Sequence, residues 1–212
     1  MTINAPLPSQ IPTKRAELFG GAITTQVPES FVDASNFREV PDNQEVYVSM
    51  VDGTDISVIV DLLQRVEASS EEAAVKVHFD DVVVDRPGKV FGIQSIQLPN
   101  FEGFPVYSLI GTVSANPAAR NAVETAEPAP YTALLITIIR LAEKKTDIVV
   151  TVNVPFLKNN MWVEEGRIAA PGYTGVLDDQ KTSQWLDAGL AVRDKALQAL
   201  NIHDWSLFVD DE

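Results

Sequence analysis

Two strongly apolar runs separated by a short charged segment occupy residues 131–154, which read YTALLITIIRLAEKKTDIVVTVNV. Both runs, Tyr131–Leu141 and Asp147–Val154, are rich in the β-branched residues that favour strands. The segment between them, which contains Lys144, Lys145 and Thr146, is short enough for a hairpin. The stretch therefore predicts two adjacent antiparallel strands.

Strand-like and helical patterns continue on both sides of this stretch. Val90–Leu98 and Pro105–Ser114 have the same β-rich composition, so we expect four sequential strands in this half of the chain. Residues 159–181 are rich in Gly and Asn and predict a loop, in which Trp162 lies. Beyond the loop, apolar residues at helical spacing predict a helix over Thr182 to about Leu200.

Two more helices are predicted upstream of the four strands. From Asp55 onward, apolar residues recur at helical spacing and predict an amphipathic helix of about three turns; its apolar positions are Ile56, Ile59, Leu62, Leu63 and Val66. Ser69 and Glu72 then form a capping-box pattern. From this pattern we expect a helix over Glu71 to about Val84.

The first fifty residues predict short strands joined by turns. Leu18–Val27 has the β-branched content of a short strand pair bent at Gly20 and Gly21. Asp33–Asn36 offers several N-cap residues for a short helix or turn, and Val46–Val48 is typical of a strand. The first strands of the core are therefore expected to start near Leu18.

These elements predict an α+β fold, in which helices flank a central, largely antiparallel sheet of about six strands in an α/β/α sandwich. The length of 212 residues fits one large domain or at most two small ones. We expect a flexible, proline-punctuated leader at residues 1–15, a single domain at 16–208 and an acidic tail at 209–212.

The charge balance limits the kinds of partner that the protein can bind. Asp and Glu number 30 against 16 Lys and Arg, so the net charge is −14. Nucleic-acid backbones and anionic lipid surfaces attract proteins of the opposite sign, so we expect neither as a partner. A basic protein surface would be attracted instead.

The chain has no cysteine, which excludes disulfides, thiolate metal sites and cysteine nucleophiles. The N-terminus lacks an apolar core of signal-peptide length.

No motif in the chain predicts catalysis, a cofactor or a metal ion. His78 and His203 have no nucleophile motif nearby and are interpreted as ordinary surface or half-buried histidines. The paired acids lack the alternating spacing of a calcium loop. Gly20 and Gly21 are not followed by the Lys-Ser/Thr of a phosphate-binding loop. We therefore predict a protein that is not an enzyme and carries no cofactor.

One charged segment, at residues 31–47, stands out between strands and hydrophobic residues. If Asp42–Glu45 forms a turn, its two carboxylates at positions i and i+3 face the same way. Together with Glu39 they would form a compact acidic patch. A solvated loop explains the same residues, and the pattern alone leaves both interpretations open.

The same region carries a series of short motifs: ELFGGAI at 17–23, VP at 27–28, Phe31, DAS at 33–35, REVPD at 38–42 and QEVY at 44–47. In these motifs it closely resembles the Mog family of Ran guanine-nucleotide release factors. Weaker similarities follow in the family's order: IVDLL at 59–63, IRL at 139–141, TDIVV at 146–150, NVP at 153–155 and SLF at 206–208. Together they span nearly the whole chain.

The resemblance implies a single domain with a largely antiparallel sheet between helices, shared with the photosystem PsbP proteins. It also implies a nuclear protein that binds Ran, promotes loss of its guanine nucleotide and supports nuclear protein import. We expect this protein to be a monomer and to occur in the cytoplasm as well. It leaves open whether a Ran-binding protein acts together with it. The acidic surface that contacts Ran maps onto Asp42 and Glu45, and Arg38, Glu39, Pro41 and Asp33 are flanking candidates.

A different class of function fits the same fold. In this alternative the acidic face belongs to a non-catalytic binding or scaffold module for another basic protein, and no nucleotide is released. Only the Ran interpretation predicts faster nucleotide loss from Ran.

Overall fold

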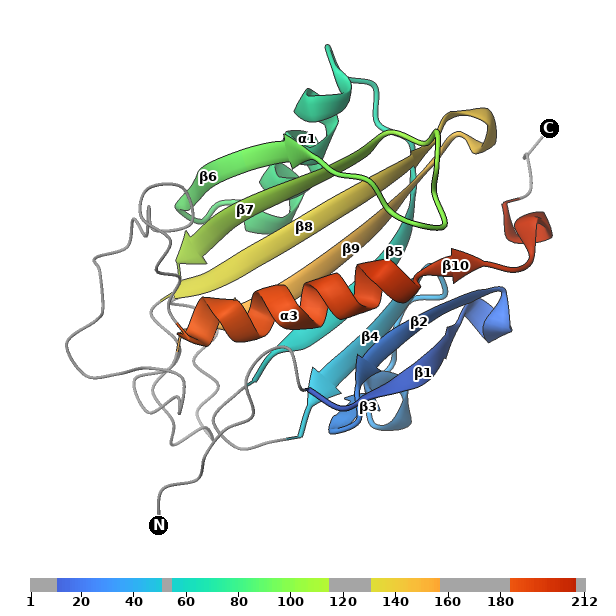
Figure 1. Ribbon diagram of the computed structural model, residues 1–212. Helices are drawn as coiled ribbons and strands as arrows, with labels where there is room; N and C mark the ends of the chain where they lie inside the picture. Colours follow the sequence, from blue (N-terminus) through green and yellow to red (C-terminus); the bar gives the residue numbers. More distant parts are fainter. Residues whose placement is uncertain (1–10, 51–54, 115–130, 157–183, 209–212) are drawn as a thin grey trace.

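The computed structural model describes residues 11–50, 55–114, 131–156 and 184–208, which form two β-sheets and two α-helices (Figure 1). The larger sheet has seven strands in the order β3-β4-β5-β9-β8-β7-β6, and every neighbouring pair is antiparallel. Its strands are β3 (Phe31–Asp33), β4 (Gln44–Ser49), β5 (Ser57–Gln64), β6 (Gly88–Ser95), β7 (Val106–Ser114), β8 (Tyr131–Leu141) and β9 (Thr146–Pro155). The smaller sheet contains β1 (Thr13–Leu18), β2 (Ile23–Pro28) and β10 (Asn201–Ile202).

The core lies on both faces of the large sheet, because the central strand β8 is buried along nearly its whole length. Alternate side chains of a strand point to opposite faces, and β8 has hydrophobic residues on each. Leu135 and Ile139 belong to one hydrophobic cluster, and Leu134, Ile136 and Ile138 belong to the other. Two separate layers therefore pack on the same sheet.

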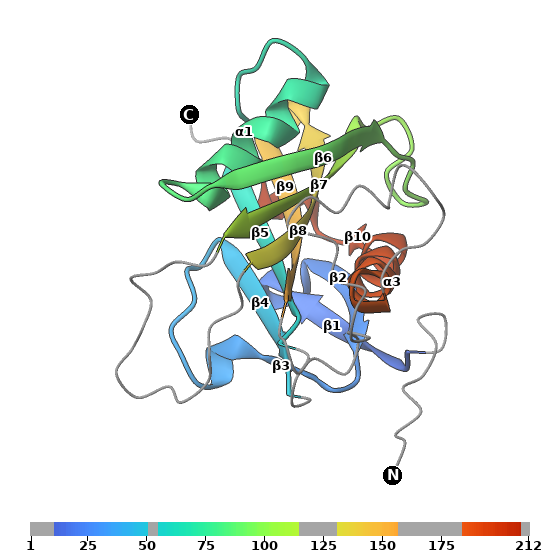
Figure 2. The same ribbon diagram turned by 90° about the vertical axis from the view of Figure 1, so that its left-hand side faces the viewer.

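The two helices cover opposite faces of that sheet (Figures 1 and 2). Helix α1 (Glu71–Val83) packs on β6, β7 and β8, and helix α3 (Gln184–Ala199) packs on β8, β9 and the small sheet's β2. Gly189 lets α3 approach closely, since a Cβ there would meet Val154 Cγ2 at 2.3 Å. Gly111 of β7 does the same for α1, because a Cβ there would lie 2.5 Å from the Phe79 ring.

The predicted α+β class, with an antiparallel sheet between helices, is confirmed. The hairpin at residues 131–154 is confirmed as β8 and β9, joined by a short 3-10 turn at Ala142–Lys144. The four sequential strands and the helices at 71–84 and 182–200 are confirmed, with the bounds above. The cap of α1 is Ser70, whose Oγ accepts from Ala73 N–H at 3.0 Å, one residue after the predicted Ser69.

The helix predicted from Asp55 is wrong, because residues 57–64 form strand β5 between β4 and β9. Val58 and Val60 are buried on one face of the sheet, and Leu63 packs against the cluster on the other. An inner strand with apolar residues on both faces also satisfies a helical spacing, so the spacing did not discriminate between the two.

Three other expectations differ from the structure. The main sheet has seven strands where about six were expected, and the strand pair near residue 20 lies in a second sheet. Strand β1 begins at Thr13, inside the segment expected to be a leader, because Thr13 pairs with Pro28 of β2. The predicted loop at 159–181 and the tail at 209–212 lie outside the described residues.

Candidate functional site

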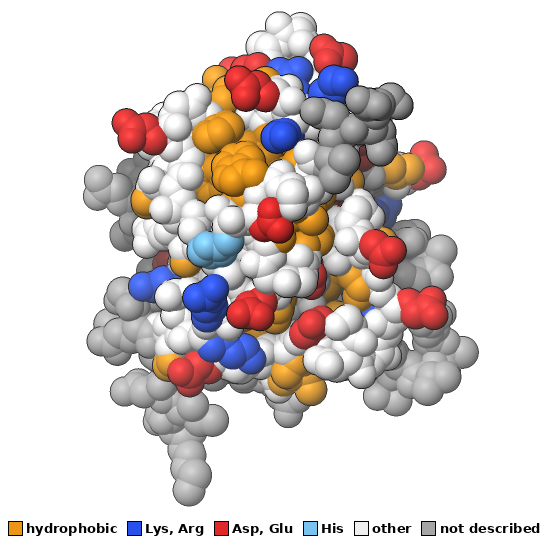
Figure 3. All heavy atoms as spheres, turned by 90° about the vertical axis from the view of Figure 1, so that its right-hand side faces the viewer, with side chains coloured by type: hydrophobic (Ala, Val, Ile, Leu, Met, Phe, Trp, Pro, Cys, Tyr) orange, Lys and Arg blue, Asp and Glu red, His pale blue; other side chains and the backbone are white. Residues whose placement is uncertain are grey.

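An open groove of about 700 Å³ lies where five separate segments of the chain meet. The segments are the end of β1 with the turn after it, the region after β3, the turn before β4, Leu62 of β5, and Leu207 near the C-terminus. Four carboxylates line this acidic groove, those of Glu17, Asp33, Asp42 and Glu45. Figure 3 shows the side of the molecule with the β1–β2 turn and the C-terminal segment, where acidic and hydrophobic side chains are interspersed.

A short turn places Asp42 at the rim of the groove. Gln44 N–H donates to the Pro41 carbonyl at 2.9 Å, which closes the turn around Asp42 and Asn43. The turn is fastened to β5, since Leu62 N–H donates to the Asn43 carbonyl at 2.9 Å and the Asn43 amide donates to the Leu62 carbonyl at 3.3 Å. Asp42 is therefore exposed on a well-supported backbone.

Glu45 lies deeper, at the start of β4, where its side chain is half-buried. Its Oε1 accepts a hydrogen bond from Phe19 N–H at 2.6 Å, which ties the β1–β2 turn to β4. This turn needs left-handed backbone at Gly20 and Gly21, with φ of 66° and 91°, values that glycine adopts easily. The two glycines thus shape the β1–β2 turn. This turn lines the groove at Phe19 and Gly20, and Glu45 holds it against β4.

The surroundings of the groove raise the pKa of Glu45 and of the nearby phenol of Tyr47. Burial raises the pKa of Glu45 above its usual value and the charge of Asp33 adds to this, although the Phe19 N–H opposes it. Burial and the charges of Asp33, Glu45 and Glu17 raise the pKa of Tyr47 to about 12. Because the described lining contains no lysine or arginine, a cation from outside would relieve this repulsion.

Four of the six predicted partner-binding residues line the groove: Asp33, Pro41, Asp42 and Glu45. Arg38 and Glu39 are exposed but outside the lining, and the Arg38 guanidinium donates to the backbone carbonyl of Glu39 at 3.3 Å. The turn expected over Asp42–Glu45 is displaced by one residue, to Pro41–Gln44, because Glu45 already belongs to β4. The role of all six in binding stays a prediction.

Sequence reasoning missed the groove residues that come from other parts of the chain. Glu17 and Phe19 lie in the segment that carried the family resemblance, and Leu207 lies in its last short motif, but neither pattern indicated a shared site. The charge at Glu17 was visible in the sequence. Its proximity to Asp33 and Glu45 depends on the pairing of β1 with β2 and on the Phe19 contact.

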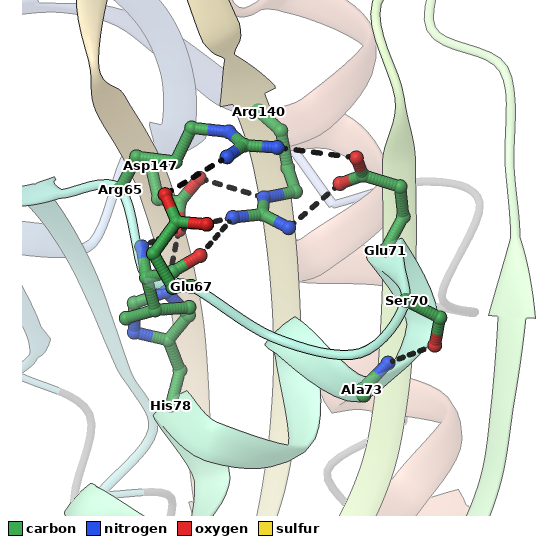
Figure 4. A network of polar contacts seen from close by, with 9 residues as sticks. Arg65, Glu67, Ser70, Glu71, Ala73, His78, Arg140 and Asp147 are labelled. Carbon is green, nitrogen blue, oxygen red and sulfur yellow. Dashed lines mark hydrogen bonds and ion pairs between the residues drawn. The ribbon is translucent and has the colours of Figure 1, made fainter.

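A second group of charged residues, which we call the buried ion cluster, lies on the α1 face of the sheet and consists of Arg65, Glu71, His78, Arg140 and Asp147 (Figure 4). Arg140 of β8 faces Asp147 of β9, with Nε 2.9 Å from Oδ1. His78 Nε2 lies 3.0 Å from Asp147 Oδ2, and Arg140 Nη1 lies 2.7 Å from Glu71 Oε2. The cluster thereby joins α1 to the β8–β9 hairpin.

The surroundings of Asp147 favour its charged form. Burial by itself raises the pKa of this carboxyl, but the contacts with His78, Arg140 and the Val66 N–H together lower it below the usual value. The expectation of a surface or half-buried His78 is wrong, because it is 3% exposed and lies against Asp147. His203 is exposed and its Nε2 contacts Thr24 Oγ1 at 2.8 Å. His78, Arg140 and Asp147 are shielded from solvent, whereas Glu71 at the edge of the cluster is 38% exposed, and we interpret the cluster as a structural element.

Neither of these groups is arranged as a metal centre. Within residues 11–50, 55–114, 131–156 and 184–208, no three His, Asp or Glu side chains are grouped so that they could hold a metal ion. Neither helix in this part of the chain has the length and apolar character needed to cross a membrane.

Comparisons with known proteins place the chain in a family. The family model described as Ran-interacting Mog1 protein matches residues 16–155. The nuclear import protein MOG1 of Saccharomyces cerevisiae is 36% identical over 155 residues, which cover 68% of this chain and 67% of that protein. The Ran guanine nucleotide release factor of Homo sapiens is 32% identical over 145 residues, which cover 68% of this chain and 77% of that protein.

A solved structure agrees with these matches. The crystal structure of the Saccharomyces cerevisiae Ran-binding protein Mog1p superposes with a TM-score of 0.68 and 26% identity, over 94% of this chain and 100% of that one. The chain therefore belongs to the family of Ran-interacting Mog1 proteins.

Proposed function

We propose that this protein binds the small GTPase Ran, favours loss of its guanine nucleotide and thereby supports nuclear protein import. The names of the relatives, a nuclear import protein and a Ran guanine nucleotide release factor, support this function. The observation that carries the proposal is the acidic groove, whose four carboxylates all fall within the matched residues 16–155. Of these carboxylates, Asp42 and Glu45 are the ones that we infer to contact Ran.

The groove has the chemistry to bind a cation that otherwise holds phosphate. In P-loop GTPases a lysine and a magnesium ion neutralise the phosphates of the nucleotide. A groove lined by carboxylates and docked beside that site competes for the lysine or disturbs the metal. Burial, with a smaller contribution from the charge of Asp33, raises the pKa of Glu45, and a cation bound beside Glu45 would stabilise its charged form.

Thermodynamic linkage sets how much binding this mechanism needs. A factor that lowers the nucleotide affinity of a GTPase must bind the empty GTPase more tightly by the same ratio. A thousandfold effect corresponds to about 4 kcal/mol of coupling. Two or three charge-assisted hydrogen bonds, at roughly 1.5 to 3 kcal/mol each, supply that amount. The carboxylates of Asp42 and Glu45 alone can accept this number of bonds.

The test is release of a fluorescent guanine nucleotide from purified Ran, with and without this protein. We expect the protein to accelerate release and the double variant Asp42→Ala/Glu45→Ala to lose most of the acceleration. Because Glu45 also accepts from Phe19 N–H, the isosteric pair Asp42→Asn/Glu45→Gln is measured in parallel, since it keeps an oxygen acceptor at that position. The matched control is Asp80→Ala/Asp81→Ala, which removes two exposed charges from α1, outside the groove lining.

The outcomes separate the two classes of function. Acceleration that is lost in both groove variants and kept in the control supports the proposal. A stable complex with Ran without faster release indicates the alternative, a binding or scaffold module. Equal activity of the groove variants and the control would contradict the assignment of the groove.

We propose further that the protein acts by binding, without active-site chemistry, as a monomer in the nucleus and cytoplasm. The relatives named as release factor and nuclear import protein support the binding role and the location, and the monomer is a separate proposal. A Ran-binding protein acting with it is an additional proposal, and adding candidate proteins to the release assay tests it. Sedimentation of the free protein tests the monomer.

A further inference from the structure

An exposed tryptophan sits on a rigid aromatic support beside the acidic groove. Trp205 is 40% exposed and stacks on Phe104, with ring centroids 6.0 Å apart and planes 20° from parallel. Phe104 in turn meets the buried Phe101 edge-on at 6.2 Å, and Trp205 meets the buried Phe208 at 5.9 Å. We call these four residues the aromatic cluster.

The backbone around Trp205 is held by local hydrogen bonds. Asp204 Oδ1 accepts from Ser206 N–H at 2.9 Å and from the Ser206 hydroxyl at 2.6 Å, which caps the 3-10 turn at Trp205–Leu207. These bonds lower the pKa of the exposed Asp204, whose carboxylate is ionised at neutral pH and adjoins Trp205 in the chain. The indole is therefore fixed in position before any partner arrives.

The aromatic cluster and the acidic groove belong to one surface. Leu207, two residues after Trp205, lines the groove itself. His203 N–H donates to the Ala22 carbonyl at 2.8 Å, which fastens the C-terminal segment to the β1–β2 turn. That same turn supplies the Phe19 N–H to Glu45. Figure 3 shows an exposed hydrophobic area on this side of the molecule, with both acidic and basic side chains near it.

We propose that Trp205 is the apolar centre of the Ran-binding surface, where it packs against the stem of a lysine or arginine of Ran. This inference rests on the proposed function and adds a residue from the other end of the chain. An indole with one face already stacked loses little freedom on binding, and tryptophan is enriched among residues that dominate interface energies. Lysine and arginine stems cover aromatic faces while their charges stay solvated or paired.

The negative charge around Trp205 favours a basic side chain of Ran as the binding partner over a second copy of this chain. Asp204 is adjacent to Trp205, the groove beside it carries four carboxylates, and the whole chain has a net charge of −14. A second copy would bring the same charge to the same face, which disfavours self-association there. A basic surface of Ran can pack a side-chain stem on the indole and pair its positive charges with the carboxylates of the groove.

The first test replaces Trp205 and measures the affinity for nucleotide-free Ran by calorimetry at several salt concentrations. We expect Trp205→Ala to weaken binding about tenfold or more without changing the salt dependence, because an apolar contact is lost. Trp205→Phe keeps a ring on Phe104 and should restore part of the affinity. Met50→Ala is the matched control, since Met50 is 65% exposed, follows the far end of β4 and lies outside the groove lining.

The second test observes the indole directly. The protein is labelled with 5-fluorotryptophan and followed by ¹⁹F NMR, and Trp205→Phe assigns one of the three tryptophan resonances. We expect the Trp205 resonance to shift or broaden when unlabelled Ran is added. Thermal melts of every variant ensure that affinities are compared between folded proteins.

The results distinguish this inference from the function on which it rests. If Ran binds the wild-type protein, but Trp205→Ala binds equally well and the resonance does not move, the inference is overturned and the proposed function stands. If wild-type protein does not bind Ran at all, the proposed function fails and takes the inference with it. A dimer whose formation requires Trp205 would also overturn it.

Discussion

The acidic groove and the buried ion cluster both bring carboxylates together, but they differ in what neutralises them. In the cluster, Arg140 and His78 contact Asp147 and the pKa of that carboxyl is lowered. In the groove, the described lining contains no basic residue, and the pKa of Glu45 is raised. The charges of the cluster are paired with one another and stabilise the fold, whereas the carboxylates of the groove have no basic partner in the described lining.

The difference follows from where each carboxylate lies. Asp147 is fully buried, so an unpaired charge there would be very costly, and the fold supplies partners on every side. Asp42 is exposed and Glu45 half-buried, so water screens much of their repulsion. Like charges can therefore accumulate at the groove at small cost. The four predictions below test this contrast, from the largest expected effect to the smallest.

Removing Asp147 should have the largest effect. Asp147→Ala leaves Arg140 buried with Glu71 as its remaining carboxylate, and we expect a loss of about 3 to 5 kcal/mol in the free energy of unfolding. Urea denaturation followed by circular dichroism measures it. The double variant Arg140→Leu/Asp147→Leu should lose less, because no charge is left unpaired. A loss below about 1 kcal/mol for the single variant would contradict a structural role for the cluster.

Acidification should weaken the fold through the same residue. The pKa of Asp147 is lower in the folded state, so the unfolded state binds more protons between the two values. This contribution to stability is present above about pH 3.9, the usual value for an aspartate, and is lost as the pH falls through the folded pKa. Urea titrations from pH 5 downward should show a falling free energy of unfolding. In Asp147→Asn that fall should be shallower, and an identical fall in both proteins would contradict the assignment.

Glu71 should contribute less than Asp147, because its side chain is 38% exposed. It contacts both Arg140 and Arg65, at 2.7 and 3.2 Å, so Glu71→Gln weakens two ion pairs without emptying the space. We expect a loss of about 1 kcal/mol, since partial exposure screens both pairs. Glu72→Gln, at the exposed neighbouring position, is the matched control. A change equal to that of the control would show that Arg140 depends on Asp147 alone.

Glu45 should show the smallest effect on stability and the opposite sign. Its pKa is raised in the folded state, so the folded protein binds more protons than the unfolded one just above the usual value of about 4.3. This contribution is therefore lost as the pH rises through the folded pKa. We expect Glu45→Gln to raise the free energy of unfolding at pH 7 by about 0.5 kcal/mol or less after screening. A clear destabilisation would mean that the charge of Glu45 supports the fold through its Phe19 contact.

Local patterns predicted much of the fold. The β8–β9 hairpin followed from two β-branched runs and a short connection, and α1 followed from its cap and its first turn. The same kind of pattern misplaced β5, because a strand buried on both faces repeats apolar residues at helical distances as well. The number of strands and their order depended on pairings between distant segments, such as β5 with β9.

The acidic groove was predictable only in part. Asp33, Asp42 and Glu45 were recognisable because their charges lie close together in the sequence, next to the motif that carried the resemblance. Arg38 and Glu39 lie in the same motif, yet their side chains fall outside the lining, since sequence proximity does not fix the direction of a side chain in a loop. No local pattern in the sequence indicated that the groove would also be lined by Glu17, Leu62 and Leu207.

By itself, the sequence determined the net charge, the absence of cysteine, the α+β class and an acidic segment near residue 42. These properties depend on composition or on neighbours within a few turns, where propensity and periodicity act. Only the tertiary structure decided that Phe19 would donate to Glu45, that Asp147 would lie between Arg140 and His78, and that Trp205 would stand beside the groove. Such contacts join residues far apart in the chain, and they exist only once the packing of both faces of the sheet has offset the entropy of bringing them together.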